Sequence, residues 1–165
     1  EQCSISRISG LADHTKLKEL HLAHNSISDI SVLSSCPALT YVDLGYNSIS
    51  DISVLAELPA LVDLYISNNQ ITVFPTFSKS TPLWHVDVSH NAIEDLSGLE
   101  GNLSLNFIYA DYNKIKSIAV LESCSMLVQM DLWDNPVSAE EVKKLQDVGI
   151  IINYNPNYQE PTEAA

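Results

Sequence analysis

Residues 17–47 read LKELHLAHNSISDISVLSSCPALTYVDLGYN, and the pattern in this stretch decides the fold. The motif LxxLxLxxN occurs six times in the chain, with other apolar residues at some of the leucine positions. Successive copies begin 22 residues apart, at Leu17, Leu39, Leu61, Leu83, Leu105 and Leu127. Constant spacing over six copies indicates stacked structural repeats, none of which can bury its apolar face alone.

The motif also predicts the local structure of each repeat. Its alternating leucines place one face of a short strand in the core, and the strands of successive repeats stack into a parallel sheet. An asparagine ends each motif, and its side chain can satisfy backbone groups where the chain turns. The predicted asparagine ladder is Asn25, Asn47, Asn69, Asn91, Asn113 and Asn135. A repeat of 22 residues leaves little room for a full return helix, so turns and 3₁₀ segments are expected outside.

The two ends of the chain differ from the middle. Counting backwards places Cys3 at an asparagine position, so residues 1–16 are expected to be a partial repeat that upstream residues would cap. Residues 138–158 are predicted to form a C-terminal cap helix and an in-register strand. The sequence SAEE predicts a capping box between Ser138 and Glu141, and Gly149 is expected to end the helix. Residues 159–165 read as a disordered tail or linker.

One repeat departs from the pattern. Residues 72–83 read TVFPTFSKSTPL, which puts Phe74 and Phe77 in aliphatic slots and adds Pro75. We therefore expect a rebuilt outer turn there. Cys36 and Cys124 share one slot four repeats apart, ~19 Å at strand spacing, too far for a disulfide. Both are expected to be buried apolar residues.

The charge of the chain excludes several classes of partner. It carries 21 acidic and 8 basic side chains, a net charge of −13. Nucleic acids and anionic membrane surfaces attract basic proteins, so neither is an expected partner. No apolar run approaches the ~18 residues that span a bilayer, so no membrane span is expected.

Four columns of strand and post-strand residues face away from the predicted core, onto the open face of the sheet. These columns hold five of the seven tyrosines, four of the five histidines and seven carboxylates, but no lysine or arginine. Aromatic side chains anchor protein interfaces, and acids steer a basic partner towards them. The alternative is that strand positions favour aromatic residues and acids maintain solubility. The predicted partner-binding residues are Tyr41, Asp43, Tyr46, Asp63, Tyr65, His85, Asp87, Phe107, Tyr109, Tyr112 and Trp133.

Two constellations on this face could carry chemistry. One resembles a metal cluster, with the members His85, His90, Asp63, Asp87 and Asp111. An open sheet converges such ligands poorly, and transition metals need them at ~2.0–2.2 Å. Ser89 with a histidine and Asp87 resembles a hydrolytic triad, but no closed pocket is predicted there. We therefore expect no enzyme, no cofactor and no metal. Histidines on an acidic face could make binding pH-sensitive.

The stretch ISDISVL, at residues 27–33 and again at 49–55, resembles the repeat of bacterial internalins, with a consensus close to LxxLxLxxNxISDISxLxxLxx. The resemblance covers residues 3–137 and implies an α/β, right-handed leucine-rich-repeat solenoid with a curved parallel sheet on its concave face. It also implies a secreted or cell-surface bacterial protein that binds a protein or peptide on that face.

Other readings of the same repeats remain open. The 22-residue class includes intracellular phosphatase regulators, so an intracellular scaffold is the first alternative, and a spacer within a larger surface protein is the second. We expect a monomer, with edge-to-edge association at the uncapped N-terminal end as a possibility.

Overall fold

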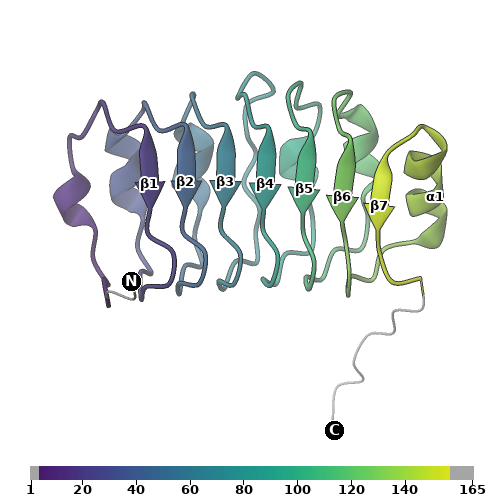
Figure 1. The fold of residues 1–165 in the computed structure, drawn as a ribbon, viewed down its shortest axis with the longest axis horizontal. Coiled ribbons are helices and arrows are strands. Elements are labelled where there is room, and N and C mark those ends of the chain that lie inside the picture. Colours follow the sequence, from purple (N-terminus) through teal and green to yellow (C-terminus); the bar gives the residue numbers. More distant parts are fainter. Residues whose placement is uncertain (1–3, 157–165) are drawn as a thin grey trace, which may run out of the picture.

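The computed structural model describes residues 4–156, which form one curved, open sheet of seven parallel strands (Figure 1). The strands follow each other in sequence order, and neighbouring strands pair in register at the 22-residue spacing, as Leu20 with Val42 and Val42 with Leu64 illustrate. The fold predicted from the repeat is confirmed. The strand bounds are β1 Glu19–His21, β2 Tyr41–Asp43, β3 Asp63–Tyr65, β4 His85–Asp87, β5 Phe107–Tyr109, β6 Gln129–Asp131 and β7 Ile151–Asn153.

The core lies between the sheet and the outer turns. The leucine positions of the motif point into it, and Leu39, Leu61 and Leu83 are fully buried. The second apolar set of each repeat, for example Ile52 and Leu55, packs behind them and is also buried. Each repeat therefore covers the apolar face of its neighbour, which a single repeat could not do for itself. Cys36 and Cys124 are buried free cysteines, as expected.

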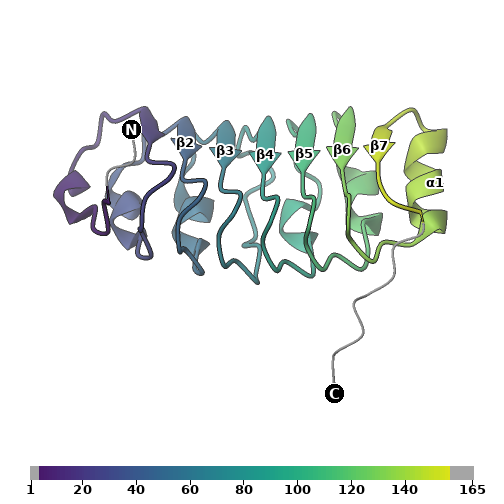
Figure 2. The same cartoon turned by 60° about the horizontal axis from the view of Figure 1, so that its bottom comes forward.

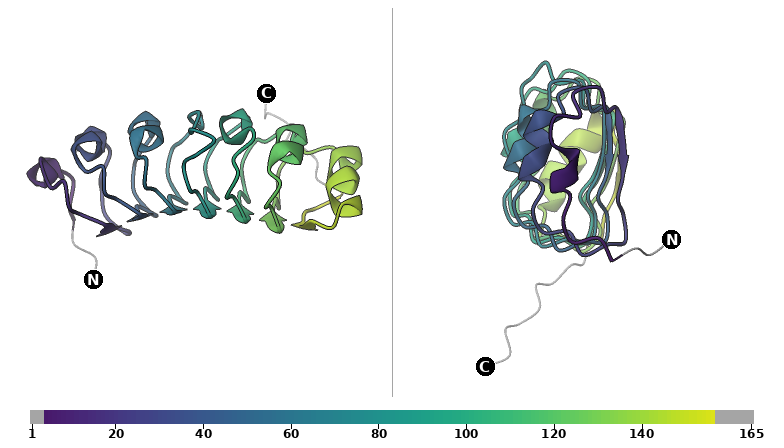
Figure 3. Two further views of the ribbon diagram at one scale, coloured as in Figure 1. Left: turned by 90° about the horizontal axis from the view of Figure 1, so that it is seen from above. Right: turned by 90° about the vertical axis from the view of Figure 1, so that its left-hand side faces the viewer.

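Short 3₁₀ helices line the side opposite the sheet, as Figures 2 and 3 show. Their bounds are η1 Ser9–Leu11, η2 Ser31–Ser35, η3 Ser53–Glu57, η4 Ser97–Leu99 and η5 Ala119–Ser123. Seen from above, the row of strands is bowed, with the sheet on the concave side (Figure 3). A 3₁₀ helix rises further per residue than an α-helix, so it spans the outer side of a repeat with fewer residues. Short 3₁₀ segments therefore fit a repeat of only 22 residues.

The third repeat has no helix between β3 and β4, and its outer segment is rebuilt as expected. Phe74 and Phe77 fill the aliphatic slots, with ring centroids 5.4 Å apart, and both are buried. Pro75 lies between them and brings its carbonyl against Gly98 of the next repeat, where an added Cβ would lie 2.1 Å from the carbonyl oxygen. The absence of a side chain at Gly98 in repeat four therefore leaves space for the backbone of Pro75 and the ring of Phe74 in repeat three.

The asparagine ladder joins adjacent repeats on the side where the strands end. Asn113 donates from Nδ2 to the carbonyls of Val88, Ala110 and Asp111, at 3.0, 3.0 and 3.2 Å. Its Oδ1 accepts the backbone N–H of Ile93 at 3.0 Å. Asn47, Asn69, Asn91 and Asn135 have equivalent partners. One side chain thus satisfies backbone groups of its own repeat and of the repeat before it.

The C-terminal helix α1, Ala139–Asp147, packs outside the last repeat and precedes β7 (Figure 1). Ser138 caps it by accepting the N–H of Glu140 at 3.2 Å. The predicted return contact from Glu141 is wrong, because its carboxylate accepts the Ser117 hydroxyl at 3.0 Å and the Ile118 N–H at 2.8 Å. Glu141 therefore attaches the helix to the preceding repeat. Gly149, with a φ of 98°, follows the helix end as expected.

At the other end, residues of the partial repeat pair with the first full repeat without forming a strand. Ile5 accepts the N–H of Ser26 at 2.9 Å, and its own N–H bonds Asn25 at 3.1 Å. β1 is the first strand of the described sheet. The expectations for Cys3, for the last two residues of the predicted segment 138–158 and for residues 159–165 fall outside the described residues.

Candidate functional site

The four predicted columns lie together on the strand face of the sheet and on the turn that follows each strand. Their strand positions are partly exposed on one face, while the residue between them is buried, as β2 shows with half-buried Tyr41 and Asp43 around buried Val42. The alternation is the direct result of the strand period of two. Tyr46, Tyr112 and Trp133, beyond the strand ends, are 52, 50 and 47% exposed.

Five aromatic side chains at the middle of this face form a chain of ring contacts, which we call the central ladder: Tyr41, Tyr65, His85, Phe107 and Tyr109. Ring centroids are 5.3 Å apart between Tyr41 and Tyr65, 4.7 Å between Tyr65 and His85, and 5.0 Å between His85 and Tyr109. Phe107 lies 6.1 Å from His85 on the other side. The ladder runs diagonally, because consecutive rings alternate between the columns on either side of the buried strand residue.

A second aromatic group follows the strand ends, in the column that we call the exit ridge: His24, Tyr46, Asn68, His90, Tyr112 and Asp134. All six residues have positive φ, between 53° and 56°. The left-handed conformation turns the chain out of the strand, and it is uncommon for bulky residues. His24 stacks on Tyr46 with centroids 4.2 Å apart, and His90 stacks on Tyr112 at 4.3 Å. The predicted residues therefore form two neighbouring groups rather than one cluster.

Carboxylates lie around the central ladder, beside the phenols of Tyr41 and Tyr65. Burial raises the pKa of Tyr65 above its usual range, and the charges of Asp63 and Asp87 add to that effect. Tyr41 is affected in the same way, by burial and then by Asp43 and Asp63. These directions show that the acids lie close enough to the rings to bias charge there. A cation placed over the ladder would meet aromatic faces and negative charge together.

Asp111 lies at the C-terminal side of the same face and is half-buried. Burial raises the pKa of its carboxyl, and Asp131 and Asp87 raise it further, while the N–H of Trp133 opposes the shift from 2.6 Å. The bond to Trp133 fixes the backbone beside one of the predicted anchors. Asp111 therefore contributes a carboxylate to the face and also holds the backbone of Trp133 in place.

His85 is the centre of the ladder. Its Nδ1 lies 3.2 Å from the hydroxyl of Tyr65, and its Nε2 is buried without a hydrogen-bond partner. Asp87 accepts the backbone N–H of Ser89 at 3.0 Å, and among the described residues no hydrogen bond joins a histidine to the Ser89 hydroxyl or to the Asp87 carboxylate. Within residues 4–156, no three histidine, cysteine or carboxylate side chains are grouped so that they could hold a metal ion.

The titration of His85 gives a testable effect on stability. Burial lowers its pKa below the ordinary value of 6.5, although Asp63 and Asp87 oppose the shift. The folded protein therefore favours the neutral imidazole, and this contribution to stability is full above pH ~6.5 and decreases as the pH falls below that value. We expect the difference in unfolding free energy between wild type and His85→Gln to shrink from pH 7.5 to 5.0 in urea titrations. A difference that stays constant over this range would contradict the assignment.

Four residues with ring contacts on this face were not among the predicted anchors, and the first of them, His21, packs against Tyr41 with centroids 4.7 Å apart. His24 and His90 stack beneath predicted tyrosines, and Trp84 packs edge-on against Phe107 with centroids 5.0 Å apart. The 22-residue period placed the histidines on the right columns. Which rings would touch depended on side-chain rotamers, which the repeat pattern does not specify.

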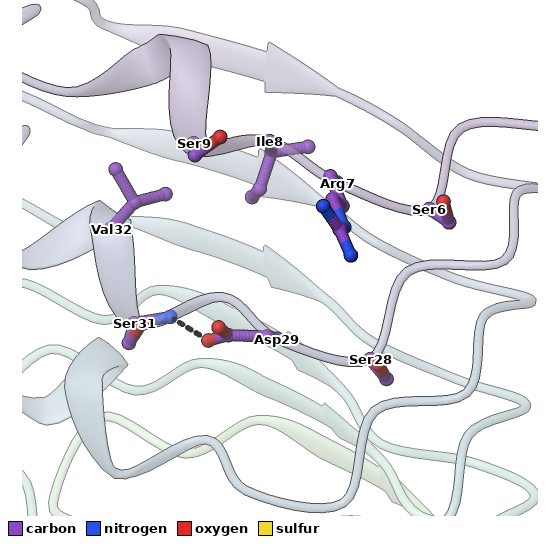
Figure 4. A pocket seen from close by; sticks show the side chains of 8 residues that line it. All are labelled: Ser6, Arg7, Ile8, Ser9, Ser28, Asp29, Ser31 and Val32. Carbon is purple, nitrogen blue, oxygen red and sulfur yellow. Dashed lines mark hydrogen bonds between the residues drawn. The ribbon is translucent and has the colours of Figure 1, made fainter.

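A separate hollow of about 580 Å³ lies between the partial repeat and the first full repeat (Figure 4). Arg7 and Asp29 line it from neighbouring coils, and Asp29 accepts the N–H of Ser31 at 2.9 Å. None of its lining residues belongs to the four columns. It is a feature of the outer turns and not part of the candidate binding face.

The chain has the fold of a leucine-rich repeat solenoid, and it is similar to internalins. A family model described as leucine-rich repeats, in two copies, matches residues 15–57. No curated protein matches the sequence significantly. Internalin C2 of Listeria monocytogenes is 28% identical, with a TM-score of 0.86 over 94% of this chain and 69% of that one.

Two further structures share the fold at 23% identity. The internalin InlF of Listeria monocytogenes superposes with a TM-score of 0.81 over 98% of this chain, and a leucine-rich repeat protein of Leptospira interrogans does so with 0.76 over 83%. The chain spans 52% and 37% of these two proteins. Proteins built from such repeats are typically interaction modules and not enzymes. Of the helices in the described part of the chain, none is long and apolar enough to span a membrane.

Proposed function

We propose that the chain is a non-catalytic protein-recognition module that binds a basic protein or peptide on its concave face. The central ladder carries the proposal: five aromatic rings in continuous contact, flanked by Asp43, Asp63 and Asp87, on columns without a lysine or arginine. Exposed aromatic groups of this extent are uncommon on a surface that contacts only water.

The aromatic and the acidic side chains of this face would have different roles in binding. Tyr65 and Tyr109 would bury their rings against the partner, where aromatic side chains contribute most of the affinity. The aspartates would speed association and select a basic partner, an effect that salt weakens. The exposed Tyr46, Tyr112 and Trp133 would extend the contact beyond the strand ends.

We further propose an extracellular or cell-surface location, as in a bacterial adhesin. The internalin-type repeats support this location. An intracellular scaffold would use the same face, and the two are distinguished by whether the protein is exported in its native host. A protease-accessibility assay on intact cells would show export as degradation of the protein without lysis.

The test is a pull-down from candidate host and self lysates with three baits. One bait is wild type, and one carries Tyr65→Ser, Asp87→Ser and Tyr109→Ser. The matched control carries Glu57→Ser, Gln70→Ser and Val73→Ser, all exposed positions outside the four columns. We expect a protein that the wild-type and control baits retain, that salt releases and that the concave variant loses. Equal retention on all three baits, or none on any, contradicts the proposal and leaves the segment as a spacer.

A further inference from the structure

One column of the concave face alternates between two kinds of side chain. It consists of the last residue of each strand from β2 to β6, and it reads Asp43, Tyr65, Asp87, Tyr109 and Asp131. These residues are register partners on adjacent strands, so each tyrosine lies between two aspartates. We call this row the alternating column. Its chemical period is two repeats, twice the period of the fold, so the stacking of the core does not require it.

The three aspartates of the alternating column are held by the protein and each keep one oxygen free. Oδ1 of Asp43 and Oδ1 of Asp87 each accept the backbone N–H two residues further along, at 3.1 and 3.0 Å. Oδ1 of Asp131 accepts the side-chain amide of Asn153 at 2.7 Å. Within residues 4–156, Oδ2 of none of the three accepts a hydrogen bond or forms an ion pair. Each carboxylate therefore retains an oxygen for a cation.

The two tyrosines of the column are held in place by His85 on the neighbouring column. Ring centroids are 4.7 Å apart between Tyr65 and His85, and 5.0 Å apart between His85 and Tyr109. The register places Asp87 between the two tyrosines, so an aromatic ring lies on each side of one carboxylate. These contacts exist without a ligand, and binding therefore does not have to order the rings first.

The spacing of the alternating column matches one backbone conformation of a ligand. Neighbouring strands lie ~4.8 Å apart, so successive aspartates of the column are ~9.6 Å apart. A polyproline II helix has three residues per turn and rises ~3.1 Å per residue, so every third residue returns to the same edge after ~9.3 Å. Equivalent residues are ~6.8 Å apart on an extended strand and ~10.5 Å apart, at seven residues, on an α-helix. Because the face is concave (Figure 3), its side-chain ends are no further apart than its strands, which favours the polyproline II repeat over the longer helical one.

We propose that the alternating column binds a basic polyproline II segment of the partner, with a lysine or arginine at every third position. The inference rests on the proposed function and specifies the chemistry of the partner. The basic side chains pair with the three aspartates. The prolines between them pack on Tyr65 and Tyr109, since aromatic grooves are the surfaces that recognise proline-rich segments. Seven residues, with basic side chains at the first, fourth and seventh, cover the ~19 Å from Asp43 to Asp131.

Fluorescence anisotropy with two labelled peptides tests the spacing at low salt. The first peptide, PPKPPKPPKPP, has a lysine at every third position, and the second, PPPPKKKPPPP, has the same composition with its lysines together. We expect the wild-type chain to bind the first peptide roughly tenfold more tightly, because the second can pair with only one aspartate at a time.

Two variants with the same loss of charge locate the contact. Asp87→Asn keeps an acceptor for the N–H of Ser89 and removes the carboxylate, and it is expected to weaken the first peptide about fivefold. Glu57→Gln removes one charge at an exposed position on the outer side, and it is expected to leave the affinity unchanged. Circular dichroism melting checks that both variants fold.

A double-mutant cycle completes the test. The middle lysine of the first peptide faces Asp87 in either direction of binding, so replacing it by glutamine is expected to weaken binding to the wild type about fivefold and binding to Asp87→Asn not at all. Independent losses in the cycle overturn the inference, and so does the absence of binding. Equal affinity for the two peptides also overturns it, but if Asp87→Asn weakens both, the proposed function stands and only the spacing is wrong. The pull-down with the concave variant decides the proposed function separately.

Discussion

Replacement of Asn113 by alanine is expected to lower the unfolding free energy by roughly 3–5 kcal/mol, the largest effect of any single substitution considered for this chain. The side chain is 5% exposed and makes four hydrogen bonds to backbone groups of two repeats. Alanine removes all four bonds, each worth ~0.5–1.5 kcal/mol, and leaves the buried N–H of Ile93 unsatisfied at a further cost of ~1–3 kcal/mol. The carbonyl of Val88 keeps a second donor, the Nδ2 of Asn91 at 3.0 Å. Urea unfolding measures the change through the transition midpoint and its slope.

The matched control is Asn25, which occupies the same position in the first full repeat. Within residues 4–156, its Nδ2 donates only to the carbonyls of Leu22 and Ala23, and its Oδ1 accepts the N–H of Ile5. It is also more exposed than Asn113. We expect Asn25→Ala to cost about half as much, since water can replace the lost partners. Equal costs at the two positions would show that burial and inter-repeat bonding do not determine the strength of the ladder.

Gly98→Ala is expected to destabilise the protein by about 3 kcal/mol, as overpacking of a rigid site does. A Cβ at this position would lie 2.1 Å from the carbonyl oxygen of Pro75 and 2.7 Å from its carbonyl carbon. A backbone cannot yield as a flexible side chain can, so the whole outer segment of repeat three would have to move. Phe74 and Phe77 on that segment are buried, and their packing would be lost with it.

Gly10 provides an unusually close control. It lies in the same slot four repeats earlier and in the same Ser-Gly-Leu sequence, at Ser9–Leu11 against Ser97–Leu99. A Cβ at Gly10 would meet nothing within 4 Å. Gly10→Ala is therefore expected to change stability by less than ~0.5 kcal/mol. Thermal melts of the two variants compare the costs, and similar melting temperatures would contradict the role of the Pro75 carbonyl.

The repeat pattern was sufficient for the architecture because one physical rule recurs in every coil. Leucine at alternating positions and asparagine at the turn fix the strand, its register and its outer return together. The same rule failed where a residue acts across repeats in a way that periodicity does not encode. Glu141 was predicted to bond its own helix, and it bonds Ser117 and Ile118 instead. The close approach of the Pro75 carbonyl to Gly98 is also a contact between two repeats, and the periodicity did not predict it.

The sequence predicted which residues lie on the candidate binding face, but it did not predict which of their side chains contact one another. The columns that carry Tyr65, His85 and Tyr109 follow from counting 22 residues, and the structure brings these rings into contact. The diagonal path of the ladder and the separate stacking of Tyr46 on His24 depend on side-chain packing between repeats. The sequence also suggested that histidines on the acidic face could make binding pH-sensitive, and for His85 burial lowers the pKa, so that this ring gains its charge only at lower pH.

The central claim is that recognition takes place on the concave face, and site-specific photo-cross-linking tests it most directly. A photoreactive phenylalanine analogue replaces Tyr46 or Tyr112, exposed aromatic residues of the exit ridge, or Val73 on the outer segment as the control. Each protein is irradiated with the proteins that the wild-type bait retains. The account predicts a cross-linked product from positions 46 and 112 and none from position 73. Cross-linking from position 73 alone would contradict it and would assign recognition to the outer turns.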